Sequence, residues 1–254
     1  MRRLHGRRRT LRNPPKDQID YKMASLLIVA TGNQHKVDEI GAILPPSITC
    51  VPMRVLGDCP ELIEDGDTFE ANAEKKVTQL GAWMRTKPPL RFPIDRFEDV
   101  QLLADDSGLA VDALDGAPGV HSARFAAESH DSGNANDQAN NAKLLSLLLD
   151  VTTEHRTARF WCVLALLKNP FDESSQTEFF TGQCEGRIAT ERYGREGFGY
   201  DPLFFPNGQQ QSFGQLGAAV KNKISHRAKA LEALAAHLKP KGGDTHSAAH
   251  PLFS

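Results

Sequence analysis

The sequence is organised around residues 102–111, which read Leu-Leu-Ala-Asp-Asp-Ser-Gly-Leu-Ala-Val. An apolar run typical of a buried strand leads directly into the adjacent carboxylates of Asp105 and Asp106. Buried carboxylates are unfavourable unless a cation or hydrogen-bond donors compensate their charge. We therefore expect a metal-binding, water-activating site at the end of this strand. Taken alone, the stretch is equally compatible with an ordinary turn before Gly108, capped by one of the two aspartates.

The composition is ordinary for a globular protein. The 254 residues are 24% charged and 40% hydrophobic, and the chain is long enough to bury a sizeable core. No apolar run is long enough to span a membrane, so we expect no membrane partner. The cysteines show no Cys-x-x-Cys pair and no close histidine, which favours reduced thiols of a cytoplasmic protein over zinc ligands: Cys50, Cys59, Cys162 and Cys184.

Charge is distributed unevenly along the chain. Residues 1–24 hold eight basic and two acidic residues, so the remainder holds 22 basic and 30 acidic residues, a net charge of -8. An acidic body argues against nucleic-acid binding and fits carboxylates that hold divalent cations. We expect residues 1–24 to be a disordered basic extension, although an Arg-rich arm or a transit peptide is compatible with them. Residues 25–239 are expected to form a single domain and residues 240–254 a disordered tail.

A strand–turn–helix unit precedes the central stretch. Residues 25–30 read as a buried strand, and apolar residues at helical spacing follow from Val37 to Leu44. The turn and the first helical turn between them offer free backbone N–H groups and a positive dipole end to an anion. We expect them to bind a triphosphate, to which Thr31 adds a hydroxyl, Asn33 an amide and Lys36 a cation. The alternative is that Asn33 only caps the helix and Lys36 is solvated.

Periodicity and capping residues predict the remaining elements. We expect a strand over residues 48–55 and a helix over residues 68–85 with Asp67 as N-cap and Glu70 in a capping box. A Pro-rich surface insertion follows at residues 85–99. A helix is predicted over residues 137–149, with Ala142, Leu145 and Leu149 on its apolar face. Antiparallel strands are predicted over residues 158–167 and 179–185, and Ser225 is predicted to cap a final helix whose apolar face holds Ala230, Leu231, Leu234 and Leu238.

Two single residues near the central stretch are candidates for the site. Glu64 lies in an acidic turn from which it could reach a metal, although a solvated acid is the simpler interpretation. Arg124 follows the loop formed by Gly116, Pro118 and Gly119. An arginine near a carboxylate pair can clamp phosphate oxygens or can form a salt bridge.

Residues 194–205 interleave glycines with aromatic residues, which lets the backbone approach a ligand closely. Phe198 and Tyr200 can stack on a base, while Asp201 can accept a hydrogen bond from a base N–H. A turn whose aromatic residues anchor it to the core is the alternative. Basic residues also cluster at the start of the final helix, where they suit an anion or purine oxygens: Lys221, His226 and Arg227.

Five motifs occur in a diagnostic order. They are Thr-Gly-Asn-x-x-Lys at 31–36, Asp-Asp-Ser-Gly-Leu at 105–109, Gly-Ala-Pro-Gly-Val at 116–120, Phe-Gly-Tyr-Asp-Pro at 198–202 and Ser-His-Arg at 225–227. Together they resemble the inosine/xanthosine triphosphate pyrophosphatase family, in its bacterial form, over roughly residues 26–238. These enzymes remove noncanonical purine nucleotides from the nucleotide pool. The basic extension and the insertion depart from the family pattern but touch no motif.

The resemblance implies an α/β fold with an elongated mixed sheet, flanking helices and two lobes around a deep cleft, in a homodimer. It implies Mg²⁺-dependent hydrolysis of dITP, ITP and XTP between the α and β phosphates. Asp106 then resembles the general base and a metal ligand, and Glu64 resembles the second metal ligand. Residues 31–36 match the phosphate cradle. The remaining substrate contacts implied are Ser107, Phe198, Gly199, Tyr200, Asp201, Lys221, His226 and Arg227.

Two other functions are compatible with parts of the sequence. A septum-inhibitor-like nucleotide pyrophosphatase shares the general architecture but prefers other bases, and the motifs at 198–201 and 225–227 argue against it. A nucleotide- or RNA-binding module that uses the basic arm is a different class, and the acidic body argues against that.

Overall fold

A six-stranded mixed sheet forms the centre of the structure, a computed structural model that describes residues 25–86, 99–127 and 136–238. The strand order is β2-β1-β3-β4-β5-β6. The first strand is parallel to both of its neighbours, and the other pairs are antiparallel. The strands are β1 (Ser25–Val29), β2 (Ile48–Pro52), β3 (Val100–Val111), β4 (Thr157–Lys168), β5 (Thr177–Ile188) and β6 (Phe204–Pro206).

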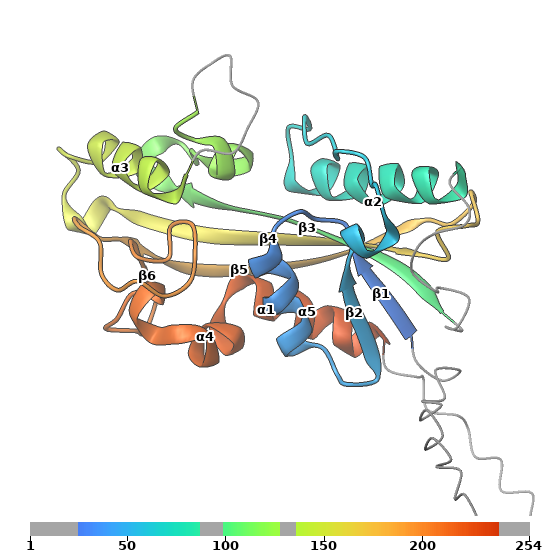
Figure 1. The fold of residues 1–254 in the computed structure, drawn as a ribbon. Helices are drawn as coiled ribbons and strands as arrows, with labels where there is room; N and C mark the ends of the chain where they lie inside the picture. The colour runs from blue at the N-terminus through green and yellow to red at the C-terminus, as the bar shows by residue number, and fades with distance from the viewer. Residues whose placement is uncertain (1–24, 87–98, 128–135, 239–254) are drawn as a thin grey trace, which may run out of the picture.

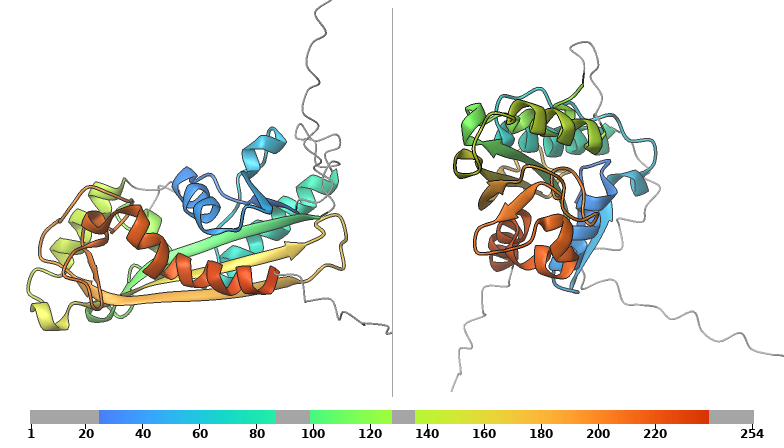
Figure 2. Two further views of the ribbon diagram at one scale, coloured as in Figure 1. Left: turned by 90° about the horizontal axis from the view of Figure 1, so that it is seen from below. Right: turned by 90° about the vertical axis from the view of Figure 1, so that its left-hand side faces the viewer.

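Helices cover both faces of this sheet (Figure 1). On one face lie α1 (Gln34–Ile43), α4 (Phe213–Ile224) and α5 (His226–Leu238). On the other face lie α2 (Phe69–Thr86) and α3 (Asp137–Leu147), at opposite ends of the sheet. The three strands of 12 residues each make the sheet long, as the view from below in Figure 2 shows. The predicted mixed α/β sheet with flanking helices is confirmed; the deep cleft between two lobes stays a prediction.

Apolar residues of alternating strand positions build separate cores on the two faces. Leu102 and Ala104 pack with α2, whereas Leu103 packs with α1 and α5. The end of the sheet near α3 has a third core, which includes Leu109 and Phe160. Strand β3 therefore contributes to all three cores, and its position in the molecule is fixed from both sides.

Several predicted bounds are wrong for identifiable reasons. The strand predicted over residues 48–55 ends at Pro52, because its partner β1 ends at Val29, and Met53–Leu56 form a 3-10 turn. The helix α2 is capped by Thr68 rather than by Asp67, since Thr68 Oγ1 accepts a hydrogen bond from Ala71 N at 3.1 Å. The predicted cap at Ser225 is confirmed, since its Oγ accepts from Ala228 N at 3.1 Å.

The apolar face predicted for α3 is wrong at two of its three residues, while Leu145 packs against the core as predicted. Ala142 is exposed, and Leu149, which is 77% exposed, lies beyond the helix end. The buried face holds Asn140 and Asn141 as well as Leu144. These amides satisfy the backbone of neighbouring loops: Asn140 Oδ1 accepts from Ala126 N at 2.7 Å, and Asn141 Nδ2 donates to Gly199 O at 2.8 Å. The buried face of α3 is thus partly polar, because its asparagines hydrogen-bond to two loops, and the spacing of apolar residues does not reveal such a face.

The predicted division of the chain stays a prediction at its ends. The expected basic extension at 1–24, most of the insertion at 85–99 and the tail at 240–254 lie outside the described residues. Among the described helices, none combines the length and the apolar character needed to cross a membrane.

Candidate active site

The site forms where β1 ends and its neighbour β3 continues. The last pair of the two strands joins Val29 to Leu103, and Ala30 N donates to Leu103 O at 2.8 Å. Asp105 and Asp106 follow directly on β3 and pair with β4 on the other side. The expectation that the two aspartates end their strand is therefore wrong. It is β1 that ends, and this exposes the edge of β3 to the helices beside it.

Strand alternation separates the two neighbouring carboxylates. Successive side chains of a strand point to opposite faces of a sheet. Asp105 accordingly contacts Lys36 of α1 and Arg227 of α5 on one face. Asp106 contacts Lys76 of α2 on the other face. Both lysines nevertheless reach the freed edge of β3, since each donates to the carbonyl oxygen of Asp105, at 3.2 and 2.9 Å.

Asp105 is fully buried and fully paired. Its carboxylate lies 2.6 Å from Lys36 Nζ and 2.7 Å from Arg227 Nε, and it accepts further bonds from Ser107 Oγ at 2.6 Å and Cys162 Sγ at 3.3 Å. Burial alone would raise the pKa of Asp105, but the charges of Arg227 and Lys36 hold it well below its usual range. This carboxylate stays ionised and anchors the cations around it.

A chain of buried charges continues from Arg227. Its guanidinium also binds Glu39 of α1, whose other oxygen lies 2.8 Å from Lys221 Nζ. Lys221 in turn lies 2.6 Å from Asp201. Burial raises the pKa of Asp201, although Lys221 favours its charged form. Lys221 and Arg227, expected to contact substrate, are thus only 3% and 1% exposed and already held by carboxylates.

Asp106 has a different environment. Lys76 Nζ lies 3.1 Å from Asp106 and 3.2 Å from Glu64, and Asn72 Nδ2 donates to Asp106 at 3.3 Å. Burial raises the pKa of Asp106 against the attraction of Lys76 and Lys36, and the nearby Glu64 raises it further. Burial works in the same direction on Glu64, but Lys76 and Lys36 leave its pKa lowered. Two carboxylates thus converge on a single ammonium group.

Four of these contact residues are missing from the sequence-based prediction of the site: Asn72, Lys76, Glu39 and Cys162. A signal for the first two exists, because both lie on the buried face of α2 among Ala73, Val77 and Leu80. A polar residue on an apolar helix face needs a partner. For Glu39 the sequence offers one weak signal of a role at the site, which is its position three residues after Lys36 on the same helix.

The predicted phosphate turn lies at this same strand end. Asn33 does cap α1, since its Oδ1 accepts from Lys36 N at 3.3 Å, and Thr31 Oγ1 accepts from Asn33 N at 3.1 Å. Lys36 is not solvated, because it is paired with Asp105. Burial lowers the pKa of Lys36, but Asp105 more than compensates and leaves it raised. Gly32 is exposed, and Gln34 donates to Asp38 at 2.6 Å.

The loop from Phe198 to Asp201 is tied down by its own polar groups. Tyr200 is buried in the core and its hydroxyl donates to Ser122 O at 2.9 Å, so its ring serves as the anchor. Asp201 accepts from Phe198 N at 2.9 Å, and Gly199 N donates to Asp137 at 2.6 Å. Phe198 is thus the aromatic residue of this loop that remains partly exposed.

His226 and Arg124 take contrasting positions. His226 is buried and stacks on Phe160 with ring centroids 4.7 Å apart. Burial and the charge of Arg227 lower its pKa well below the usual range, so the imidazole is neutral, and its Nδ1 lacks a hydrogen-bond partner within the described residues. Arg124 is partly exposed and donates to Glu64 O at 3.1 Å, which holds the acidic loop near Asp106.

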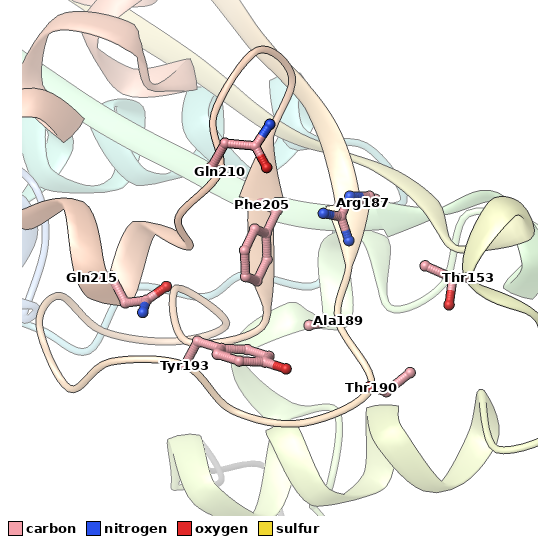
Figure 3. A pocket seen from close by; sticks show the side chains of 8 residues that line it. All are labelled: Thr153, Arg187, Ala189, Thr190, Tyr193, Phe205, Gln210 and Gln215. Atoms are coloured by element: carbon pink, nitrogen blue, oxygen red, sulfur yellow. The ribbon is translucent and has the colours of Figure 1, made fainter.

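A separate pocket lies between β5, β6 and the start of α4 (Figure 3). Its volume is about 310 Å³, and Arg187 packs over the ring of Phe205 there, 4.8 Å from the centroid. None of the predicted site residues lines it. Its lining residues are Thr153, Arg187, Ala189, Thr190, Tyr193, Phe205, Gln210 and Gln215.

The chain is similar in sequence to a known protein family over most of its length. The sequence profile of the Ham1 family matches residues 27–237. The chain belongs to the Ham1 family. It is 43% identical over 208 residues to the dITP/XTP pyrophosphatase of Shouchella clausii, covering 82% of this chain and 93% of that one. It is 45% identical over 209 residues to the dITP/XTP pyrophosphatase of Desulforamulus reducens, with coverages of 81% and 92%.

A solved Ham1 protein supports the same conclusion at the level of structure. The HAM1 protein of Coxiella burnetii is 33% identical and superposes with a TM-score of 0.68, covering 84% of this chain and 98% of that one. The matched region includes all five motifs and every charged residue described above. The resemblance inferred from the sequence is therefore confirmed, and the buried charge cluster of this Ham1 protein is its candidate active site.

Proposed function

We propose that this Ham1 protein hydrolyses dITP, ITP and XTP to the nucleoside monophosphate and pyrophosphate. The activity in the names of its relatives supports the reaction. The single observation that supports this site for it is the pair Asp106 and Glu64, which meet at Lys76 beside the N-terminus of α1. Carboxylates that could hold a metal thus neighbour a helix end that suits phosphate.

The residues present fit a Mg²⁺ ion. Mg²⁺ is usually bound through one or two carboxylates, with water and substrate phosphates completing its coordination. Within the described residues no group of three histidine, cysteine or acidic ligands gathers, but the pair Glu64 and Asp106 meets the Mg²⁺ pattern. When bound there, the ion neutralises phosphate charge and lowers the pKa of a bound water.

Asp106 is the general base of the proposed reaction. Its raised pKa suits it to take a proton from the water that attacks the α-phosphorus. The bond from that phosphorus to the bridging oxygen then breaks, and pyrophosphate leaves with the electron pair. Positively charged groups near the leaving phosphates supply most of the stabilisation in such reactions. Lys36 and Arg124 are the cations proposed for that role, with the backbone of Thr31, Gly32 and Asn33.

Selection of the base is proposed to occur at the purine 6-position. A site that donates hydrogen bonds to a 6-oxo group leaves a donor unpaired against a 6-amino group, which is unfavourable. Phe198 supplies a stacking surface, and Lys221, His226 or backbone N–H groups near Tyr200 supply donors. Lys221 is held by Glu39 and Asp201, and since its ammonium group has three N–H donors, the third is the one proposed to bind the base.

We also propose a cytoplasmic homodimer, as the family resemblance implies. Cys50, Cys59, Cys162 and Cys184 all lack a disulfide partner, which supports a reducing compartment. Size-exclusion chromatography with light scattering tests the dimer.

Product analysis tests the proposed reaction. The purified protein with Mg²⁺ is given ITP, XTP, ATP and GTP in parallel, and phosphate products are separated by ion exchange. Pyrophosphate and monophosphate from ITP and XTP, with little product from ATP and GTP, are expected. Orthophosphate as the first product contradicts the proposed bond cleavage. Absence of turnover with all four supports the septum-inhibitor-like or nucleotide-binding alternatives.

A further inference from the structure

His35 and Phe198 stack on each other although they lie far apart in the sequence. His35 lies in the first turn of α1, and Phe198 lies in the loop before β6. Their ring centroids are 5.5 Å apart, and the ring planes differ by 15°. The position of His35 in the phosphate motif predicts a phosphate contact, but its ring lies on the aromatic surface proposed for the base.

Stacking is the main interaction of the His35 side chain. His35 is exposed, and no hydrogen bond or ion pair joins its imidazole to another of the described residues. The backbone that carries it is fixed, because Val37 and Ile40 of α1 are buried in the core. An exposed side chain on a fixed helix can change rotamer without moving the helix.

The two cations near the Phe198 ring are held in place, unlike the His35 side chain. Lys221 Nζ lies 4.5 Å from the ring centroid and Arg227 Cζ lies 5.7 Å from it. Both cations are buried and ion-paired, Lys221 with Asp201 and Arg227 with Asp105. His35 is thus the mobile partner of the Phe198 ring among the groups that contact it.

We propose that His35 covers the stacking surface of Phe198 and turns aside when the purine base binds. The inference rests on the proposed function, because it takes Phe198 as the residue on which the base stacks. Residue 35 then sets the affinity for the base by competing with it for one aromatic face. An aromatic pair contributes enough for its loss to change affinity by about twofold to tenfold.

The variant His35→Ala tests this competition. Binding of IMP, which carries the base, and of pyrophosphate, which does not, is measured by titration calorimetry with Mg²⁺. We expect His35→Ala to lower the Kd for IMP by about twofold to tenfold and to leave the Kd for pyrophosphate unchanged. His35→Phe keeps an aromatic ring on Phe198 and is expected to bind IMP no more tightly than the wild type.

A double-mutant cycle with Phe198→Leu makes the assignment specific. If His35 acts through Phe198, His35→Ala does not tighten IMP binding in the Phe198→Leu background. Equal or weaker binding of IMP by His35→Ala overturns the inference, since His35 is then inert or clamps the base. A general loss of pyrophosphate binding overturns it as well, because His35 then serves the phosphates.

The outcome is separable from that of the proposed reaction. Turnover of ITP by the wild type tests the reaction alone. If the wild type does not hydrolyse ITP but His35→Ala binds IMP more tightly than the wild type does, the His35 inference stands and the proposed reaction is refuted. If the wild type hydrolyses ITP but His35→Ala leaves the Kd for IMP unchanged, the proposed reaction stands and the His35 inference is refuted.

Discussion

Asp105 and Asp106 are adjacent in sequence, yet their surroundings shift their pKa values in opposite directions. Asp105 has a salt-bridge partner on each of two helices, so its pKa is lowered; Asp106 is buried next to a second carboxylate, so its pKa is raised. The first therefore acts as a permanent anion that organises cations. The second has the pKa direction expected of a base. The alternation of a strand is what gives two neighbouring residues such different roles.

Replacement of Lys76 tests its control of Asp106. Lys76→Met removes the cation that attracts the charged form of Asp106, so the pKa of Asp106 rises further. Because the base acts only when ionised, the acidic limb of the profile of kcat/KM against pH is expected to move to higher pH. Lys75→Met is the control, since Lys75 is partly exposed and pairs with the exposed Asp65. An unchanged profile in Lys76→Met contradicts this role.

Replacement of Asp105 tests its structural role. Asp105→Asn leaves Arg227 and Lys36 short of their partner, and loss of one member of a buried pair destabilises by about 3 to 5 kcal/mol. We expect the free energy of unfolding of Asp105→Asn, measured by urea denaturation at pH 7, to be lower than that of the wild type by this amount. Asp65→Asn, at an exposed carboxylate, is expected to have no measurable effect.

The pH dependence of this effect follows from the lowered pKa of Asp105. A carboxyl with a lowered folded-state pKa stabilises the fold above its unfolded-state pKa of about 3.9, and this contribution disappears as the pH falls through the folded-state value. The difference between Asp105→Asn and the wild type is therefore expected to narrow below about pH 4. A difference that is constant from pH 7 to pH 3 would refute this account.

At the residue scale, the sequence predicts the motifs but not their distant partners. The Asp-Asp pair, the Asn33 cap and the Ser225 cap rest on local chemistry and can be recognised from the chain alone. The pairs Asp105–Arg227 and Glu39–Arg227 join residues 122 and 188 positions apart. Such pairing depends on the strand order and on helix packing, which local patterns do not specify.

At the scale of elements, close contact between α5 and β5 places Arg227 at the site. A Cβ atom built at Gly182 of β5 would lie 2.2 Å from His226 O and 2.5 Å from Ala230 N, both of them backbone atoms of α5. A glycine in the middle of a strand thus marks the point where a helix backbone approaches the sheet. The sequence predicts both elements, and Gly182 within the strand indicates a close approach, but the sequence does not indicate that α5 is the element that approaches.

Gly182→Ala tests that contact. Since the clash is with backbone, α5 must move, and we expect the free energy of unfolding to fall by about 2 to 3 kcal/mol. Gly41→Ala is the matched control within α1, where a Cβ meets nothing within 4 Å. There the better helix propensity of alanine is expected to raise stability by up to about 1 kcal/mol. Equal denaturant midpoints for Gly182→Ala and the wild type would show that α5 is not held this closely.

At the scale of the whole molecule, the shortness of β1 creates the site. β1 has five residues and β3 has twelve, so the freed edge of β3 lies between α1 and α2. The sequence predicts most of the strands and the final helix because their apolar patterns are long and regular. It does not predict that β1 lies between β2 and β3, because strand order depends on packing of the complete chain.

Removal of residues 1–22 tests whether the described region contains the complete site. All five motifs lie between residues 31 and 227, so we expect the truncated protein to keep the kcat/KM of the full chain for ITP. Steady-state kinetics of both proteins at equal Mg²⁺ concentration provide the measurement. A large loss of kcat/KM would mean that the basic extension takes part in folding or binding.

The most direct test of the account is the effect of Asp106→Asn on kcat for ITP, measured together with IMP binding and thermal unfolding. We predict that kcat falls by about 10²- to 10⁴-fold, while IMP still binds and the protein remains folded, because the variant removes a base without removing the charges that hold Asp105. A folded Asp106→Asn variant with a kcat near that of the wild type would contradict the assignment of Asp106 as the base.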